Sequence, residues 1–386
     1  MNRPGALHDA SSQFGKAVQD FSVTIRAVRT LCFTQPMIPI HVNTFAGVLA
    51  LVLTVVEASD GTEGYSLARA HGGQSGRVIA NQIEASLRPL VIGRDPADRD
   101  EIWDAMAAKE QPGYVSVFAI SALDVALWDL AAKLQGVTVA QLCGGRRKAM
   151  RAYASSTHHD SVDAYVADLQ AALALGFTAY KVHPFYDAAR DMVLARALRE
   201  AAGPDVHLML DAAKRYDARD ALRVGEVLQS LDYHWYEEPL PQQDWAAYRN
   251  LRDVLQIPVM GGETLPGLHQ AIANAIDARA YAAVLCDVYW KGGITGCLKT
   301  MALCQARGVE VVSHHGASAL MNLANLHVMC GASEVEMIEV LVPQVPYHYG
   351  LREYLQVDAD GYARLPTGPG LGAEPDWSYI EAHRTA

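Results

Sequence analysis

The sequence has few cysteines, no long apolar run and no excess of basic residues, and each absence excludes a class of protein. Its six cysteines are scattered and none forms a CxxC pair, which disfavours a disulfide scaffold or a zinc site. We expect buried thiols in a reducing cytoplasm. No run of about 18 apolar residues is present, so we expect no transmembrane helix. The polar N-terminus, MNRPGALHDASSQFGK, lacks the apolar middle region of a secretory signal.

The charge balance argues against large anionic partners. The chain has 32 basic and 43 acidic residues and a net charge of −11, so no basic field is available to hold nucleic acid or an anionic membrane. With 386 residues, of which 51% are hydrophobic, it is long and apolar enough for a globular barrel plus a second domain. We therefore expect a soluble cytoplasmic enzyme that acts on a small molecule.

Residues 1–150 are expected to form an α+β domain. The segments 21–33 and 47–57 are rich in β-branched residues, and a turn signal follows the second, so they predict a small antiparallel sheet. The segment 34–46 between them contains two prolines and predicts a loop. From about 76 to 142 the apolar residues recur at helical spacing, most clearly in SALDVALWDLAAKLQG.

Residues 151–340 alternate short apolar strands with longer helical stretches. This alternation predicts a parallel sheet, and eight units predict a closed βα barrel. The segment 341–386 has too many glycines and prolines for another unit, and we expect it to return to the first domain. The candidate strands are 151–156, 179–183, 207–211, 234–238, 258–263, 282–287, 309–314 and 335–339.

An ionisable residue ends nearly every candidate barrel strand, at intervals of about 25 residues. A single polar residue at a strand end often caps the following helix, but capping does not explain a series on successive strands. Because barrel active sites lie at the C-terminal ends of the strands, the series predicts a site there. Its members are Lys181, His183, Asp211, Glu237, Glu238, Glu263, Asp287, His314 and Glu339.

Three acids of this series, Asp211, Glu237 and Glu263, would repel one another unless a cation lies between them. Ligation by oxygen alone favours a hard ion such as Mg²⁺. Glu238 competes with Glu237, because strand alternation lets only one of the two point inward. The alternative is a set of structural salt bridges, for which the nearby cations are Lys214, Arg215 and Lys291.

Two further pairs have the spacing of an acid–base site. Lys181 and His183 are two residues apart on a predicted strand, so both point towards the same side. His314 follows Asp287 by one barrel unit, so the carboxylate can hydrogen-bond the imidazole and raise its basicity. The alternative is that His314 is an ordinary polar residue at a strand end, and the adjacent His315 leaves the assignment open.

An ordered set of motifs covers nearly the whole chain after residue 20. By these motifs the chain resembles the enolase superfamily, in its mandelate racemase subgroup (the mandelate racemase/muconate lactonizing enzyme family). The resemblance implies an α/β fold, a (β/α)7β modified TIM barrel with an N-terminal α+β capping domain. The motifs are SALDVALWDLAAK, QLCGG, GFTAYKVH, LMLDA, WYEEPLP, PVMGGE, DVYWKGGITG, SHHG, MIE and GPGLGAEPDW.

The resemblance also implies a metal site. It places one Mg²⁺ per subunit on Asp211, Glu237 and Glu263, and it selects Glu237 over Glu238 because the first glutamate of the EEP motif is the ligand. It further implies a homo-oligomer, often an octamer.

The remaining strand-end residues match catalytic positions of the subgroup. Asp287 and His314 match its acid–base dyad, and Glu339 matches the acid that hydrogen-bonds the substrate carboxylate. Lys181 can neutralise that carboxylate. The chain departs at His183, where the subgroup often has a second lysine, so the resemblance does not fix the role of His183.

The implied activity is removal of the proton α to a carboxylate, which gives an enediolate. Loss of a β-hydroxyl then makes the protein an acid-sugar dehydratase, a hydro-lyase of carbohydrate acid catabolism. A racemase or epimerase of a 2-hydroxy acid is the alternative, and a non-catalytic binding relative is a third. Polar residues suited to a hydroxylated substrate favour the dehydratase, although the apolar segment 36–40 argues against it. The candidate substrate-binding residues are His41, Tyr65, Arg69, Ser155 and His315.

Overall fold

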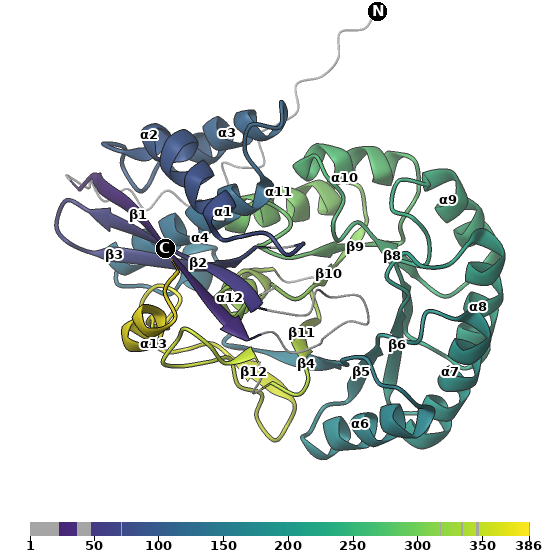
Figure 1. Cartoon of the computed structure of the whole chain (residues 1–386). Coiled ribbons are helices and arrows are strands. Elements are labelled where there is room, and N and C mark those ends of the chain that lie inside the picture. Colours follow the sequence, from purple (N-terminus) through teal and green to yellow (C-terminus); the bar gives the residue numbers. More distant parts are fainter. Residues whose placement is uncertain are drawn as a thin grey trace, which may run out of the picture.

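The computed structural model of the chain describes residues 23–36, 48–70, 72–316, 318–332, 335–344 and 347–385. A capping sheet with its helices lies beside a ring of parallel strands and outer helices (Figure 1). The predicted class, an α/β barrel with an N-terminal α+β cap, is confirmed. The division of the chain at residues 150 and 340 stays a prediction.

The cap sheet is antiparallel with the order β1-β2-β3, formed by β1 (Ile25–Pro36), β2 (Val48–Ala58) and β3 (Glu63–Arg69). The predicted loop 34–46 is wrong at its start. Strand β1 continues to Pro36, which pairs with Val48, because the whole length of β1 finds a partner in β2. The rest of that loop, including His41, lies outside the described residues.

The cap helices begin with α1 (Arg77–Gln82), which continues through a π-helical turn (Ile83–Leu87) into α2 (Arg88–Val91). They continue as α3 (Arg99–Glu110), α4 (Val117–Leu134) and α5 (Val139–Leu142). Helix α4 is buried on almost all sides, because it packs between the cap sheet and the barrel. This explains why its sequence is apolar and rich in alanine throughout rather than amphipathic.

Eight parallel strands form the barrel, in the spatial order β10-β9-β8-β7-β6-β5-β4-β11, and β10 and β11 lie in contact at the closure. Their interior faces pack against one another in a separate apolar cluster that includes Tyr153, Met209 and Trp235. The strands are β4 (Ala149–Ser155), β5 (Ala179–Val182), β6 (His207–Asp211), β7 (Trp235–Glu237), β8 (Val259–Gly261), β9 (Ala283–Cys286), β10 (Glu310–Ser313) and β11 (Met337–Leu341).

The outer helices follow the strands, and several begin at an aspartate or serine whose side chain accepts a hydrogen bond from the first helical turn. The helices are α6 (Val162–Ala174), α7 (Ala188–Ala202), α8 (Ala218–Ser230), α9 (Trp245–Val254), α10 (Leu268–Asp277), α11 (Gly293–Ala306) and α12 (Ala319–Gly331).

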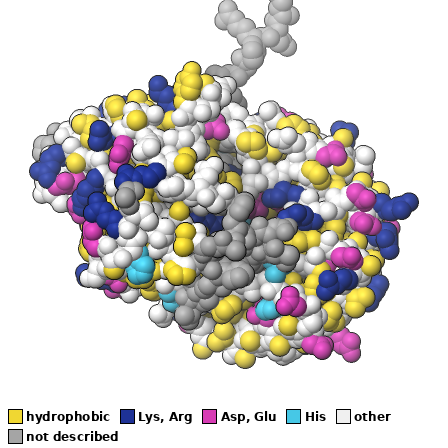
Figure 2. Space-filling view, viewed as in Figure 1, with side chains coloured by type: hydrophobic (Ala, Val, Ile, Leu, Met, Phe, Trp, Pro, Cys, Tyr) yellow, Lys and Arg dark blue, Asp and Glu magenta, His cyan; other side chains and the backbone are white. Residues whose placement is uncertain are grey.

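The C-terminal segment joins both halves. Strand β12 (Tyr362–Arg364) pairs antiparallel with β4. Helix α13 (Trp377–Ala382) follows, and the backbone of Thr385 then donates a hydrogen bond to the carbonyl of Cys32 in β1. All six cysteines are buried free thiols. Among the described residues, no helix has the length and apolarity needed to cross a bilayer. Acidic and basic side chains are intermixed on the face shown in Figure 2.

Candidate active site

Three acidic side chains form a row at one end of the barrel, which we call the carboxylate row: Asp211, Glu237 and Glu263. Asp211 and Glu237 end β6 and β7 and are direct partners in the parallel register. Glu263 follows the end of the next strand, β8, by two residues. The row therefore occupies the mouth, by which we mean the end of the barrel where the strands have their C-termini.

Lys181 and His183 contact the Asp211 end of the row. The Lys181 ammonium lies 3.8 Å from Asp211 Oδ2, and His183 Nε2 lies 3.1 Å from the same oxygen. His183 Nδ1 is 2.8 Å from the carbonyl of Ser156, which can only accept, so Nδ1 carries a proton. Burial would raise the pKa of Asp211, but the hydrogen bond from His183 and the nearby charges hold it well below its usual range.

The middle acid, Glu237, is fully buried. It accepts hydrogen bonds from Lys181 Nζ at 2.8 Å and from Trp235 Nε1 at 3.0 Å. Burial raises its pKa well above the usual range; Lys181 opposes this shift, while Asp211 and Glu339 add to it. A cation bound beside Glu237 would oppose the effect of burial and favour its ionised form.

Glu339 of β11 completes the surroundings of Lys181. Its Oε1 lies 2.9 Å from Lys181 Nζ, and its Oε2 accepts a hydrogen bond from the backbone of His315 at 2.8 Å. Burial would raise the pKa of Glu339, but the charge of Lys181 and the nearby histidines hold it below its usual range. Glu339 is therefore ionised in the free protein, whereas a hydrogen bond donated by Glu339 to a substrate would need its protonated form.

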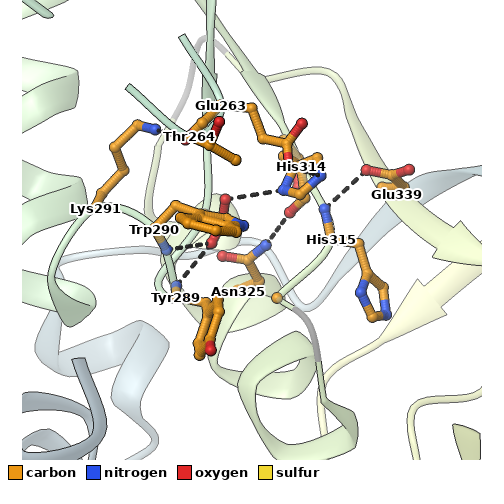
Figure 3. A network of polar contacts seen from close by, with 12 residues as sticks. Glu263, Thr264, Tyr289, Trp290, Lys291, His314, His315, Asn325 and Glu339 are labelled. Carbon is orange, nitrogen blue, oxygen red and sulfur yellow. Dashed lines mark hydrogen bonds and ion pairs between the residues drawn. The ribbon is translucent and has the colours of Figure 1, made fainter. Parts of the chain in front are cut away.

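His314 and Asp287 are in contact at the other end of the row, where Figure 3 shows His314 beside Glu263. His314 Nδ1 lies 2.9 Å from Asp287 Oδ2, and its Nε2 lies 3.4 Å from Glu263 Oε1. Burial lowers the pKa of His314, but Glu263 and the hydrogen bond with Asp287 outweigh it and raise the pKa to about 10. His314 therefore carries a proton in the free protein.

Several residues that we did not predict hold this pair in place. Asp287 Oδ1 accepts hydrogen bonds from the backbone N–H groups of Tyr289 and Trp290, at 2.7 and 2.8 Å. Asn325 of α12 donates to the carbonyl of His314 (Figure 3) and accepts from the backbone N–H of Val288. A buried asparagine within the apolar run of α12 was the sequence signal for this role.

Glu238 contacts a different set of residues from Glu237. Its carboxylate lies 2.8 Å from Lys214 Nζ and accepts a hydrogen bond from the backbone of Glu263 at 3.1 Å. Of the cations considered as salt-bridge partners, Lys214 approaches Glu263 only to 3.9 Å, whereas Arg215 lies over the ring of Tyr186.

The candidate substrate-binding residues Ser155, His315 and Arg69 lie on three different parts of the fold. Ser155 ends β4 beside Glu339, and the His315 ring faces Tyr347 at a centroid distance of 6.0 Å. Arg69 ends β3, and its carbonyl accepts a hydrogen bond from the Tyr289 hydroxyl, which brings the cap to the barrel loop that carries Asp287.

Tyr65 is not brought to the carboxylate row. Its hydroxyl donates to Glu63, and its ring packs against Trp377 and lies 4.2 Å from the Lys133 ammonium. Tyr65 lies near the start of β3, where its backbone N–H donates to Asp129 of α4, so it contacts α4 and the C-terminal segment instead.

The row suits a hard cation by its chemistry, since its donors are three carboxylates on adjacent strands. As they stand, these side chains contact His183, Lys181 and His314, and no three acidic, histidine or cysteine side chains among the described residues are close enough to share an ion. The three carboxylates would therefore have to turn towards one another to share a cation.

The fold and the mouth define a class, the capped βα-barrel enzymes with acid–base groups around a row of carboxylates. Comparison with known protein families identifies the family within this class. Residues 25–144 match the mandelate racemase / muconate lactonizing enzyme N-terminal domain, and residues 164–379 match the enolase C-terminal domain-like family. The chain belongs to the mandelate racemase / muconate lactonizing enzyme family of the enolase superfamily.

Among its relatives, D-galactarolactone cycloisomerase from Agrobacterium fabrum is 31% identical, over 84% of this chain and 89% of the relative. Arabinonate dehydratase from Saccharolobus solfataricus is 28% identical, over 84% and 88%. The crystal structure of D-glucarate dehydratase from Agrobacterium tumefaciens complexed with magnesium has a TM-score of 0.84 and 30% identity, over 94% of this chain and 99% of that one.

Proposed function

We propose that this protein is a Mg²⁺-dependent acid-sugar dehydratase that removes the proton α to a carboxylate and then eliminates the β-hydroxyl as water. The observation that carries the proposal is a carboxylate row with a histidine in contact at each end. The names of two relatives, arabinonate dehydratase and D-glucarate dehydratase, support an acid sugar as substrate.

The carboxylate row would hold the ion. Mg²⁺ bound there would supply positive charge to the substrate carboxylate and stabilise the charge that develops on it. The related D-glucarate dehydratase was crystallised as a complex with magnesium, which supports this choice of ion. Lys181, fully buried between Glu237 and Glu339, would add a fixed positive charge at the same place.

His314 and His183 would move protons at the two ends of the row. His314 Nε2 faces Glu263, while Asp287 fixes Nδ1, so Nε2 is the nitrogen that would reach the substrate. His183 is held in the same way through its Nδ1 by Ser156, so its Nε2, which lies 3.1 Å from Asp211 Oδ2, would exchange the proton. One histidine would take the α-proton and the other would protonate the leaving hydroxyl.

A racemase or epimerase is the second candidate. His183 follows β5 and His314 follows β10, so the two histidines stand on well-separated strands of the ring and could serve opposite faces of one carbon. The cycloisomerase among the relatives supports isomerisation as an outcome. The homo-oligomer and the cytoplasmic location stay predictions.

A screen of mono- and diacid sugars for 2-keto acid formation, with and without Mg²⁺, tests the proposal. We expect one or a few sugars to give a 2-keto-3-deoxy acid only when Mg²⁺ is present. Inversion at the α-carbon without a 2-keto acid would instead identify the epimerase. Binding of an acid sugar without turnover would identify the non-catalytic relative.

A further inference from the structure

Lys291 is a buried cation immediately behind the carboxylate row. It lies in the loop after β9, four residues beyond Asp287, and is only 2% exposed. Its Nζ donates to the carbonyl of Gly262 at 2.7 Å and to the carbonyl of Glu263 at 2.5 Å. Figure 3 shows its side chain directed to the segment that carries Glu263 and Thr264.

Ion pairing does not explain the burial of Lys291. Within the part of the chain that the structure describes, no carboxylate oxygen lies within 4.0 Å of its ammonium, whereas Lys133, Lys181 and Lys214 each contact one at 2.8 Å. Burying an ammonium without a counter-charge is costly, and an apolar side chain would fill the same space more favourably. The role of Lys291 is therefore to donate hydrogen bonds to the two backbone carbonyls, of Gly262 and Glu263.

Those carbonyls belong to the turn that delivers Glu263 to the mouth. Gly262 has a φ of +87°, a left-handed conformation in which the chain leaves β8. On the other side of the Glu263 residue, its backbone N–H donates to the buried carboxylate of Glu238 at 3.1 Å. The N–H and C=O of Glu263 are thus each held by a buried charge, one negative and one positive.

Lys291 also links the two ends of the site. Its own backbone N–H donates to the carbonyl of Asp287 at 3.2 Å. The loop that holds Asp287 against His314 and the turn that holds Glu263 are therefore connected through one residue. With the backbone fixed on both sides, only the side-chain torsions of Glu263 stay free to adapt to a bound ion.

We propose that Lys291 is a positioning residue for the metal site, which fixes Glu263 through the backbone carbonyls of Gly262 and Glu263. The inference rests on the proposed Mg²⁺ site and adds a residue outside the ligand set. Removing a group that orients a metal ligand typically lowers the metal affinity about 10- to 100-fold.

The test measures Mn²⁺ affinity directly, from the electron paramagnetic resonance signal of free Mn²⁺, in wild type, Lys291→Met and Lys291→Arg. We expect Lys291→Met to bind Mn²⁺ about 10- to 100-fold more weakly, and Lys291→Arg, which keeps the charge and the donors, to recover most of the affinity. If Lys291→Met does not fold, Lys291→Gln replaces it, with the same expectation of weaker binding than Lys291→Arg.

Lys133→Met is the matched control, because Lys133 is also largely buried but lies in α4 and pairs with Asp129. It should lose stability and keep wild-type Mn²⁺ affinity. Wild-type affinity in Lys291→Met, or an equal loss in Lys133→Met, would overturn the assignment of Lys291. Absence of Mn²⁺ binding by wild type would overturn the proposed metal site itself, and the role of Lys291 with it.

Discussion

At the scale of single residues, Glu263 connects the two functions that the mouth combines. Its carboxylate would bind the ion, and it also lies 3.4 Å from His314 Nε2 and raises the pKa of that imidazole. Of the three acids in the carboxylate row, Glu263 is the one in contact with this histidine, which is itself bound to Asp287. A change at Glu263 should therefore alter metal binding and proton transfer together.

We expect Glu263→Gln to remove both Mg²⁺ affinity and activity, because an amide keeps the size of the side chain but loses its charge. Calorimetric titration with Mg²⁺ and the 2-keto acid assay measure the two effects. Glu310→Gln is the control, since Glu310 is exposed at the start of β10, at the opposite end of the barrel. Full activity in Glu263→Gln would refute the metal assignment.

We expect His314→Asn to stop elimination but to permit exchange of the α-proton, if His183 is the base and His314 the acid. Asparagine can still hydrogen-bond Asp287 but cannot transfer a proton. Proton NMR in D₂O follows exchange, and the 2-keto acid assay follows elimination. An unchanged elimination rate would assign the acid to His183 or His315 instead.

The sequence predicted which side chains end the barrel strands, because hydrophobic runs and their polar ends are local features. It did not predict the roles of Lys291, Asn325 or Trp235. Lys291 and Asn325 bond to backbone groups that only the folded chain brings close. Trp235 had a more local signal, because it is two residues from Glu237 and so shares its face of β7.

At the scale of elements, helix α4 of the N-terminal domain supplies the side chain that caps the N-terminus of the barrel helix α11. Asp124 accepts hydrogen bonds from Thr295 through its backbone N–H at 2.9 Å and its hydroxyl at 2.7 Å, in the first turn of α11. Helix α11 begins at a glycine without a side-chain cap of its own, so Asp124 serves that purpose from a different element. Burial raises the pKa of Asp124 to about 7, although the bonds from Thr295 oppose the shift.

This raised pKa predicts a pH dependence of stability. The folded state holds the proton of Asp124 up to about pH 7, whereas the unfolded chain releases it near pH 4. The contribution of Asp124 to stability is thus complete below about pH 4 and falls, by at most about 1.4 kcal/mol per pH unit, as the pH rises to about 7.

Asp124→Asn cannot titrate and should lack this dependence. Thermal unfolding of both proteins between pH 5 and pH 8 should show the advantage of wild type over the variant shrinking as the pH rises. Parallel curves over this range would contradict the assignment of the pKa to Asp124.

The ends of elements were the part that sequence predicted least well. His183, Glu263, Asp287 and His314 lie just beyond the last paired residue of their strands, although the predicted strands included them. The pairing stops where the chain turns towards the next helix, and hydrophobicity alone does not mark that point. The turn is what gives these side chains access to the mouth.

At the scale of the whole molecule, the C-terminal segment ties the cap to the barrel. It contributes β12 to the barrel sheet, and its last residues exchange backbone hydrogen bonds with β1, including one from Thr34 to the carbonyl of His383. The alternation of strands and helices predicted the barrel. The composition of this segment indicated only that it is not another barrel unit.

Deletion of residues 377–386 should lower the Tm by several degrees, because it removes backbone hydrogen bonds to β1 and the buried Ile380 side chain. Differential scanning calorimetry measures the change. Ile380→Ala is the matched variant and should show a smaller loss of the same sign. An unchanged Tm after the deletion would show that the segment does not stabilise the cap.

The central claim is that the carboxylate row and its two histidines remove a proton α to a carboxylate with the help of Mg²⁺. Proton NMR in D₂O, with a broad panel of acid sugars and the Mg²⁺-loaded protein, tests it most directly. The account predicts that the α-proton signal of at least one acid disappears, and that chelation of the metal or Glu263→Gln prevents this. Retention of the α-proton by every acid with the wild-type protein would contradict it.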